Sequence, residues 1–209
     1  MTAPMYLELF DRNPFGTNCW LLGGDGDEAV VIDPGFDTDG IHERLRRSGR
    51  RPVAVLLTHA HLDHAGEAGM FAGDDVPVLI HGDDAVAYDD LERWNPGFEN
   101  PLEPVKDLRT IEDGERLRLA GLSIEVHHTP GHTPGHCSFE VGTTLAAGDL
   151  VFAGSIGRSD FPNSSPEAMR RSLRWFLTLD DGVEVLPGHG PRTTVGRERA
   201  SNPFLADLG

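Results

Sequence analysis

The stretch T-H-A-H-L-D-H (58–64) directly follows the apolar run V-A-V-L-L, and four of its seven side chains can bind a metal ion. A short apolar run of this kind is typical of a buried β-strand, so the polar side chains begin where that strand ends. Residues i and i+2 of an extended segment point the same way, so His59 and His61 can bind one ion. Asp63 and His64 come where the chain turns into a helix, and they can serve a second ion.

Three further turns carry the same kinds of side chain, and each follows an apolar run. His132 stands in T-P-G-H-T-P-G-H, Asp149 in L-A-A-G-D-L and His189 in L-P-G-H-G-P. Because a sheet holds the backbone at each strand end, these side chains can converge on one point. We expect the first of two ions to bind His59, His61 and His132, the second to bind Asp63, His64 and His189, and Asp149 to bridge them.

The donor types narrow the choice of metal. Imidazole and carboxylate groups without cysteine suit zinc, iron or manganese better than copper(I) or an iron–sulfur cluster. The sequence therefore predicts two divalent metal ions, with zinc as the first choice and iron or manganese as alternatives. Among the other histidines, His42, His81 and His127 are expected to be structural or solvated. His128 and His136 flank the predicted ligand turns and could support the ligands.

Size and charge limit the kind of protein and its partners. The 209 residues, of which 38% are hydrophobic, suit a single domain spanning 1–209 with a sizeable core. The formal net charge of -16 repels phosphate backbones and anionic lipids, so neither nucleic acid nor a membrane is an expected partner. The basic run R-L-R-R-S-G-R-R (44–51) is expected to be the solvated end of a helix, where cations suit the helix dipole.

The cysteines and the N-terminal segment predict a cytoplasmic protein. Cys19 and Cys137 are the two cysteines of the chain, and we expect both to be buried free thiols. The first ten residues lack the basic and apolar regions of a signal peptide. No apolar run approaches the length of a membrane span. The sequence leaves the oligomeric state open.

The order of the predicted elements suggests two similar halves. Helices are expected over 37–49, 65–72 and 164–176, and short strands fill much of the rest. Each half is rich in strands and contains a helix. This order fits two sheets that pack together with helices on their outer faces. Residues 92–104 read as a long loop that is either a lid or a plain surface loop.

The combination of T-H-A-H-L-D-H with His132, Asp149 and His189 resembles the metal-binding motif of the metallo-β-lactamase superfamily, and the resemblance covers nearly the whole chain. It implies an α+β fold, a four-layer αβ/βα sandwich of two mixed β-sheets with outer helices. The metals of that fold lie at one edge between the sheets, which agrees with the expected order of elements.

Two longer segments give a narrower resemblance. G-D-L-V-F-A-G-S-I-G-R-S-D-F (148–161) and residues 186–204 are similar to the short bacterial type II glyoxalases, hydroxyacylglutathione hydrolases without a C-terminal helical domain. The resemblance implies metal-dependent hydrolysis of S-2-hydroxyacylglutathione, or of a similar small thiol ester, to a hydroxy acid and a free thiol. Asp63 would be the catalytic residue that orients the attacking water. Arg158 would bind a carboxylate of the thiol, unless it is a surface arginine paired with Asp160.

Several other functions share parts of this pattern. An iron-dependent persulfide dioxygenase is the alternative, because it shares the fold and a similar G-R-[S/T]-D-F segment. The full second donor set of Asp63, His64 and His189 favours the hydrolase. A lactonase or β-lactamase fits the 148–161 and 186–204 segments less well, and a nuclease would have basic surfaces. A non-enzymatic protein on this fold would have lost ligands, and none is lost. The thiol could be glutathione, another small thiol or coenzyme A.

Overall fold

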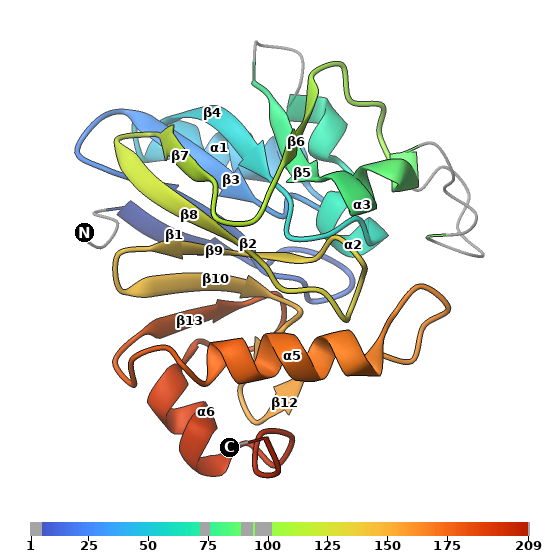
Figure 1. Cartoon of the computed structure of the whole chain (residues 1–209). Helices are drawn as coiled ribbons and strands as arrows, with labels where there is room; N and C mark the ends of the chain where they lie inside the picture. Colours follow the sequence, from blue (N-terminus) through green and yellow to red (C-terminus); the bar gives the residue numbers. More distant parts are fainter. Residues whose placement is uncertain (1–5, 72–75, 89–93, 95–101, 209) are drawn as a thin grey trace.

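Two six-stranded sheets form the centre of the computed structural model, which describes residues 6–71, 76–88, 94 and 102–208 (Figure 1). The first sheet has the order β1 (Tyr6–Phe10), β2 (Cys19–Gly23), β3 (Glu28–Ile32), β4 (Arg51–Leu56), β5 (Val78–His81) and β6 (Leu108–Ile111). The second has the order β14 (Thr193–Thr194), β13 (Glu184–Pro187), β10 (Thr144–Gly148), β9 (Cys137–Val141), β8 (Leu122–His128) and β7 (Arg116–Leu119). Both sheets contain parallel and antiparallel neighbours, so both are mixed.

Helices cover the outer faces of the two sheets. They are α1 (Thr38–Arg47), α2 (Leu62–Ala65), α3 (Gly82–Ala85), α5 (Pro166–Phe176) and α6 (Val195–Ser201), with 3-10 turns η1 (Ala68–Phe71) and η2 (Val86–Tyr88). A small hairpin of β11 (Val151–Phe152) and β12 (Ser155–Ile156) follows β10. In Figure 1, α5 and α6 lie on the second sheet, whereas α1 lies on the far side of the first.

Alternation along the strands explains the layers. Trp20 of β2 belongs to the core between the sheets, together with Phe139 of β9. Its neighbour Leu21 points to the opposite face, where it joins a second cluster with Ile41 of α1. A third cluster packs Leu173 of α5 against the outer face of the second sheet. These three apolar layers confirm the predicted four-layer αβ/βα sandwich.

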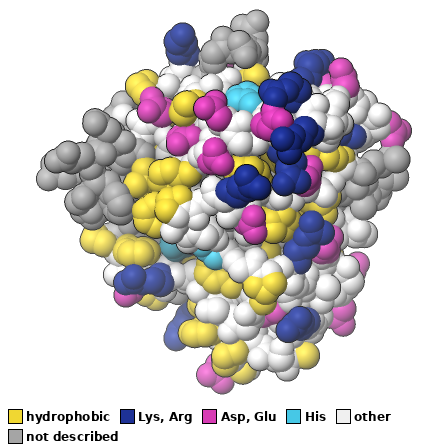
Figure 2. All heavy atoms as spheres, turned by 180° about the vertical axis from the view of Figure 1, so that it is seen from behind, with side chains coloured by type: hydrophobic (Ala, Val, Ile, Leu, Met, Phe, Trp, Pro, Cys, Tyr) yellow, Lys and Arg dark blue, Asp and Glu magenta, His cyan; other side chains and the backbone are white. Residues whose placement is uncertain are grey.

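Local signals set the helix ends. The side chain of Asp37 accepts a hydrogen bond of 3.2 Å from the backbone N–H of Gly40 and caps α1, and Gly49 ends that segment with φ of 69°. The last turn of α1 is basic, as the run 44–51 predicts, and Arg47 pairs with Glu43 at 2.7 Å. Figure 2 shows Lys and Arg side chains gathered over part of the rear face, mixed with acidic ones.

The helix expected over 65–72 differs from the structure, where α2 ends at Ala65 and η1 follows. At Gly66, just after α2, a β-carbon would lie 2.7 Å from the carbonyl oxygen of Gly35, so glycine allows the two segments to pack closely. Because α2 begins at Leu62, Asp63 and His64 lie in its single turn. Helix α6 and strand β6 were not predicted from the sequence.

The two cysteines and Trp94 are buried. Cys19 and Cys137 are buried and free, as predicted. Within 92–104, Trp94 is buried in the apolar cluster between the first sheet and α1. Residues 92, 93 and 95–101 lie outside the described part of the chain. No described helix is long and apolar enough to cross a membrane.

Candidate metal centre

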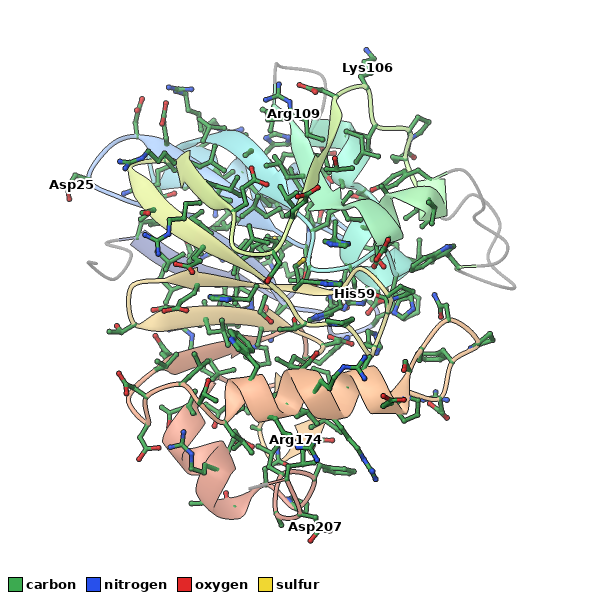
Figure 3. The ribbon with its side chains drawn as sticks, in the orientation of Figure 1. Asp25, His59, Lys106, Arg109, Arg174 and Asp207 are labelled. Atoms are coloured by element: carbon green, nitrogen blue, oxygen red, sulfur yellow. The ribbon has the colours of Figure 1, made fainter. Side chains whose placement is uncertain are left out.

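The loops that carry the predicted ligands meet at one edge of the two sheets. Strands β3, β4 and β5 run parallel, so their C-terminal ends lie side by side. The β8–β9 turn and the ends of β10 and β13 reach the same edge from the second sheet. Figure 3 shows His59 at this edge, whereas Asp25 in the β2–β3 turn lies at the opposite one.

All seven predicted ligands come together there in overlapping groups. Within each group, the candidate ligand atoms lie within 4.8 Å of one another. The groups are His59, His61 and His132; His59, His64 and Asp149; and Asp63, His64 and His189. The carboxylate of Asp149 lies 3.3 Å from Nε2 of His132 and 3.4 Å from Nε2 of His64. Asp149 therefore stands between the two sets of three, where a bridging group is expected.

Asp33, at the end of β3, fixes the orientation of two of the imidazoles. Its Oδ2 accepts a hydrogen bond of 2.7 Å from the hydroxyl of Thr58 and another of 2.9 Å from Nδ1 of His64. The Thr58 oxygen, its proton already donated, accepts from Nδ1 of His59 at 3.0 Å. With Nδ1 engaged in these bonds, both rings turn Nε2 into the cluster, so Nε2 is the atom that each ring can offer to a metal ion.

The second sheet orients its own ligands in the same way. Nδ1 of His132 donates to the backbone carbonyl of Arg158 at 2.7 Å, which turns Nε2 toward Asp149 and toward Nδ1 of His61. His136 is fully buried, and its Nε2 accepts the backbone N–H of Asp149 at 3.0 Å. This contact holds the backbone at Asp149, one of the predicted ligands. His128 instead bonds the carbonyl of Pro134 at 2.8 Å.

The β1–β2 loop holds Asp63 and His189 together. The hydroxyl of Thr17 donates to Oδ2 of Asp63 at 2.7 Å, and the same oxygen lies 3.2 Å from Nε2 of His189. Thr17 also forms an isolated β-bridge with His189. The side-chain amide of Asn18 donates to the carbonyl oxygens of Pro187 and Gly190 at 2.9 and 2.8 Å, which fixes the turn around His189.

The three histidines of the first group are neutral at ordinary pH. Burial lowers the pKa of His61 to about 3 and the pKa of His132 to about 4, and the neighbouring imidazoles add to the effect at His61. The pKa of fully buried His59 lies well below its usual value for the same reasons. Neutral imidazoles are the form that binds metals, so this group needs no proton removed before it can coordinate.

The second group has the opposite electrostatics. Burial alone would lower the pKa of His64, but the carboxylates of Asp63, Asp149 and Asp33 overcome it and raise that pKa to about 10. Burial would raise the pKa of Asp63, but His64, His189 and Thr17 hold it well below its ordinary value. The carboxylates therefore attract positive charge to this side of the cluster.

Unsatisfied buried atoms support a metal at this place. Nε2 of His59, Nε2 of His64 and Oδ1 of Asp149 are buried and have no hydrogen-bond partner in the structure. A buried polar atom without a partner costs about 1–3 kcal/mol, and three of them in one cluster fit coordination of a cation. No cysteine belongs to the described donor groups, so these donors suit zinc, iron or manganese.

Aromatic rings border the cluster on two sides. Phe161 lies 5.4 Å from His61 and 5.8 Å from His132, measured between ring centroids, and the guanidinium of Arg158 stacks 4.4 Å above it. Arg158 is also paired with Asp160 at 2.9 Å, and both side chains are exposed. On the other side, the ring of Phe152 lies 5.8 Å from that of His189. Phe15, in the β1–β2 loop, and Phe36, next to Gly35, stack on each other at 5.4 Å. Asn13 of the β1–β2 loop bonds the backbone carbonyl of Asp63 at 3.3 Å.

A further group of donors does not have the geometry of a metal site. His81 and His128 stack face to face, with ring centroids 4.0 Å apart and planes 6° apart, beside Asp83. The lone pairs of an imidazole lie in the ring plane, so parallel rings cannot both point at one ion. His42 stacks on Phe71, and His127 pairs with Glu140, as expected for structural histidines.

The roles of Asp33, Asp84 and Thr17 were not predictable from the sequence. Asp33 follows a strand, as the predicted ligands do, but D-P-G also reads as an ordinary turn. Asp84 follows V-L-I-H-G-D (78–83), and its burial could not be inferred from that pattern. Thr17 carries no local signal, because its role depends on a loop that reaches another strand end.

Comparisons with known proteins agree with this geometry. Residues 12–189 match the family model of the metallo-beta-lactamase superfamily. Hydroxyacylglutathione hydrolase GloC of Haemophilus influenzae is 36% identical over 96% of this chain and 98% of its own. The structure of TTHA1623 in a di-iron-bound form is 39% identical, with a TM-score of 0.81 over 95% of this chain and all of that one. The B3 metallo-beta-lactamase BLEG-1 is 32% identical, with a TM-score of 0.82 over 96% of this chain and 100% of its own. The chain therefore belongs to the metallo-beta-lactamase superfamily.

Proposed function

We propose that the chain is a dinuclear metal-dependent hydrolase that cleaves thioesters of a small thiol, such as S-2-hydroxyacylglutathione, to a hydroxy acid and a free thiol. The observation that carries this proposal is the pair of three-donor groups joined by Asp149 and His64. His59, His61 and His132 would hold one ion, and Asp63, His64 and His189 the other, with zinc as the first choice. The similarity to the hydrolase of Haemophilus influenzae supports the choice of substrate.

Two divalent ions in such a site would polarise a carbonyl group and make water acidic enough to attack at neutral pH. The chain supplies the orientation. Because Asp63 is held as a carboxylate by Thr17 and His189, it can accept a hydrogen bond from the attacking water and aim it at the carbonyl carbon. The departing thiolate is a stable anion, so its release requires little proton donation.

The two borders of the cluster suit the two ends of such a substrate. The stacked rings of Phe15 and Phe36 belong to loops whose Asn13 and Gly35 reach the backbone of Asp63, and they provide an apolar surface. Arg158 stacks on Phe161, which in turn contacts His61 and His132, and it provides a positive charge for a carboxylate of the thiol. Its pairing with Asp160 must open for that contact to form.

Hydrolysis of S-D-lactoylglutathione under argon tests the proposal. The purified protein would be loaded with zinc, iron or manganese and assayed with and without a chelator. We expect rapid chelator-sensitive hydrolysis, and a loss of several orders of magnitude in the Asp63→Asn variant. Glutathione persulfide with oxygen and a β-lactam serve as competing substrates. Oxygen consumption or β-lactam cleavage, without thioester hydrolysis by the loaded protein, would overturn the proposal.

A further inference from the structure

Asp84 of α3 is a buried carboxylate that belongs to neither donor group. Its side chain is fully buried, and it accepts three hydrogen bonds. Oδ2 accepts from the backbone N–H of Ala60 at 3.0 Å and from the hydroxyl of Thr133 at 2.7 Å. Oδ1 accepts from the backbone N–H of Gly135 at 2.6 Å. Three donors on one carboxylate offset much of the cost of burying its charge.

The three donors come from the two loops that build the first group. Ala60 lies between His59 and His61 on the loop after β4, and Thr133 directly follows His132 on the β8–β9 turn. These loops belong to different sheets, and Asp84 reaches both from a third position, the end of β5. One carboxylate thus connects the two sides from which the first three imidazoles approach.

Close packing adds to this connection. A β-carbon on Gly135 would lie 2.7 Å from Oδ1 of Asp84, so the glycine lets the turn close on the carboxylate. The two loops are also joined without Asp84, since the backbone N–H of Cys137 donates to the carbonyl of Thr58 at 2.8 Å. Loss of the carboxylate should therefore shift the loops relative to each other without separating the sheets.

We propose that Asp84 is a positioning residue that sets the spacing of His59 and His61 against His132, and thereby the affinity and coordination geometry of the ion bound there. This inference rests on the proposed metal binding. The carboxylate touches no reacting atom and acts only through the loops that it joins. The second donor group receives no contact from Asp84 among the described residues, so its ion should be insensitive to the change.

The test compares Asp84→Asn with Asp83→Asn, a neighbouring change on the exposed side of α3. Asparagine keeps the shape of the side chain, but its NH₂ group cannot accept a hydrogen bond. Whichever way the amide is turned, the NH₂ faces at least one of the donors that the carboxylate accepts from. Cobalt(II) titration would give the affinity of each ion, and the visible absorption of bound cobalt reports its coordination geometry. We expect one ion to bind about 10–100-fold more weakly in Asp84→Asn, with an altered spectrum. Asp83→Asn should match the parent.

A second background identifies which ion is affected. His189→Ala removes a donor of the second group, so the ion that remains should be the one held by the first. Asp84→Asn should weaken this remaining ion by the same factor. The proposal is overturned if Asp84→Asn weakens only the ion that His189→Ala removes, weakens both ions equally or changes neither.

Circular dichroism and thermal unfolding of the metal-free variants separate positioning from folding. Asp84→Asn should keep the parent's secondary structure without metal. If it does not fold, Thr133→Val is the second variant, because it removes a single donor to Asp84. We expect the same ion to bind more weakly in Thr133→Val. Unchanged affinity for that ion would refute the positioning role. A parent protein that binds no cobalt would overturn both this inference and the proposed metal centre, whereas metal binding without thioester hydrolysis would contradict the substrate alone.

Discussion

The imidazole of His132 and the backbone of Arg158 are joined by a hydrogen bond of 2.7 Å, from Nδ1 to the carbonyl oxygen. The backbone of Arg158 thus orients a candidate ligand, whereas its side chain points to the rim and stacks on Phe161. These two roles belong to different atoms, so a side-chain substitution can separate them.

Arg158→Ala should impair substrate binding and leave metal binding intact. The substitution removes the guanidinium but keeps the carbonyl that accepts from His132. A hydrogen bond to a charged group contributes about 1.5 kcal/mol, so we expect KM for S-D-lactoylglutathione to rise about tenfold. Steady-state kinetics and metal analysis check this, with Arg118→Ala, an exposed change on β7, as control. An unchanged KM would show that Arg158 does not bind the substrate.

Asp33→Asn should weaken both ions, in contrast to Asp84→Asn. The carboxylate orients His64 directly and His59 through Thr58, and these two histidines belong to different donor sets. An NH₂ group in place of Oδ2 cannot accept from the Thr58 hydroxyl or from Nδ1 of His64. We therefore expect a loss of about 10–100-fold in affinity for each ion. Titration calorimetry with zinc measures the effect. Asp25→Asn, at the opposite edge of the sheets, is the control, and equal affinities in the two variants would contradict this role of Asp33.

Gly188→Ala should disturb the cluster by steric overlap. A β-carbon on Gly188 would lie 2.2 Å from Oδ1 of Asp149 and 2.8 Å from Cε1 of His64. Overpacking of this kind costs about 1–3 kcal/mol, so the metal-free variant should unfold at lower urea concentration and should also bind zinc more weakly. A β-carbon on exposed Gly182 meets nothing within 4 Å, and Gly182→Ala should behave like the parent. Matching urea midpoints for the two variants would rule out the overlap.

Titration of His61, His132 and His64 should destabilise the metal-free protein on both sides of about pH 6.5. The pKa values of His61 and His132 are lowered to about 3 and 4, so between about pH 6.5 and 4 the unfolded chain binds protons that the folded chain excludes. Stability therefore falls on acidification through that range. The pKa of His64 is raised to about 10, so its contribution is complete below about pH 6.5 and is lost as the pH rises through 10.

Urea unfolding at several pH values, with a chelator present, measures this profile. His61→Asn removes one of the groups with a lowered pKa, so the fall in stability between pH 6.5 and 4 should become shallower. An identical slope in the variant and the parent would show that His61 does not contribute to the acid sensitivity.

Much of the site was predictable because its donors obey a local rule. Each predicted ligand loop stands just after an apolar run, and apolar runs form the strands of the two sheets. Asp33 follows the same rule, but an aspartate before proline and glycine is equally typical of a turn, so its role as a support for His59 and His64 could not be assigned. Helix α6 was missed because its seven residues show no clear helical periodicity.

The sequence by itself determined the donor chemistry and the layered fold, because side-chain type and the period-2 alternation of apolar residues are local properties. Only the tertiary structure decided which donors share a group, which ring nitrogen each histidine presents and which buried carboxylates hold the ligand loops. Nδ1 of His61 and Nε2 of His132 lie 2.9 Å apart although 71 positions separate them in the chain. Such a distance depends on how the two sheets pack, and no local pattern of residues contains it.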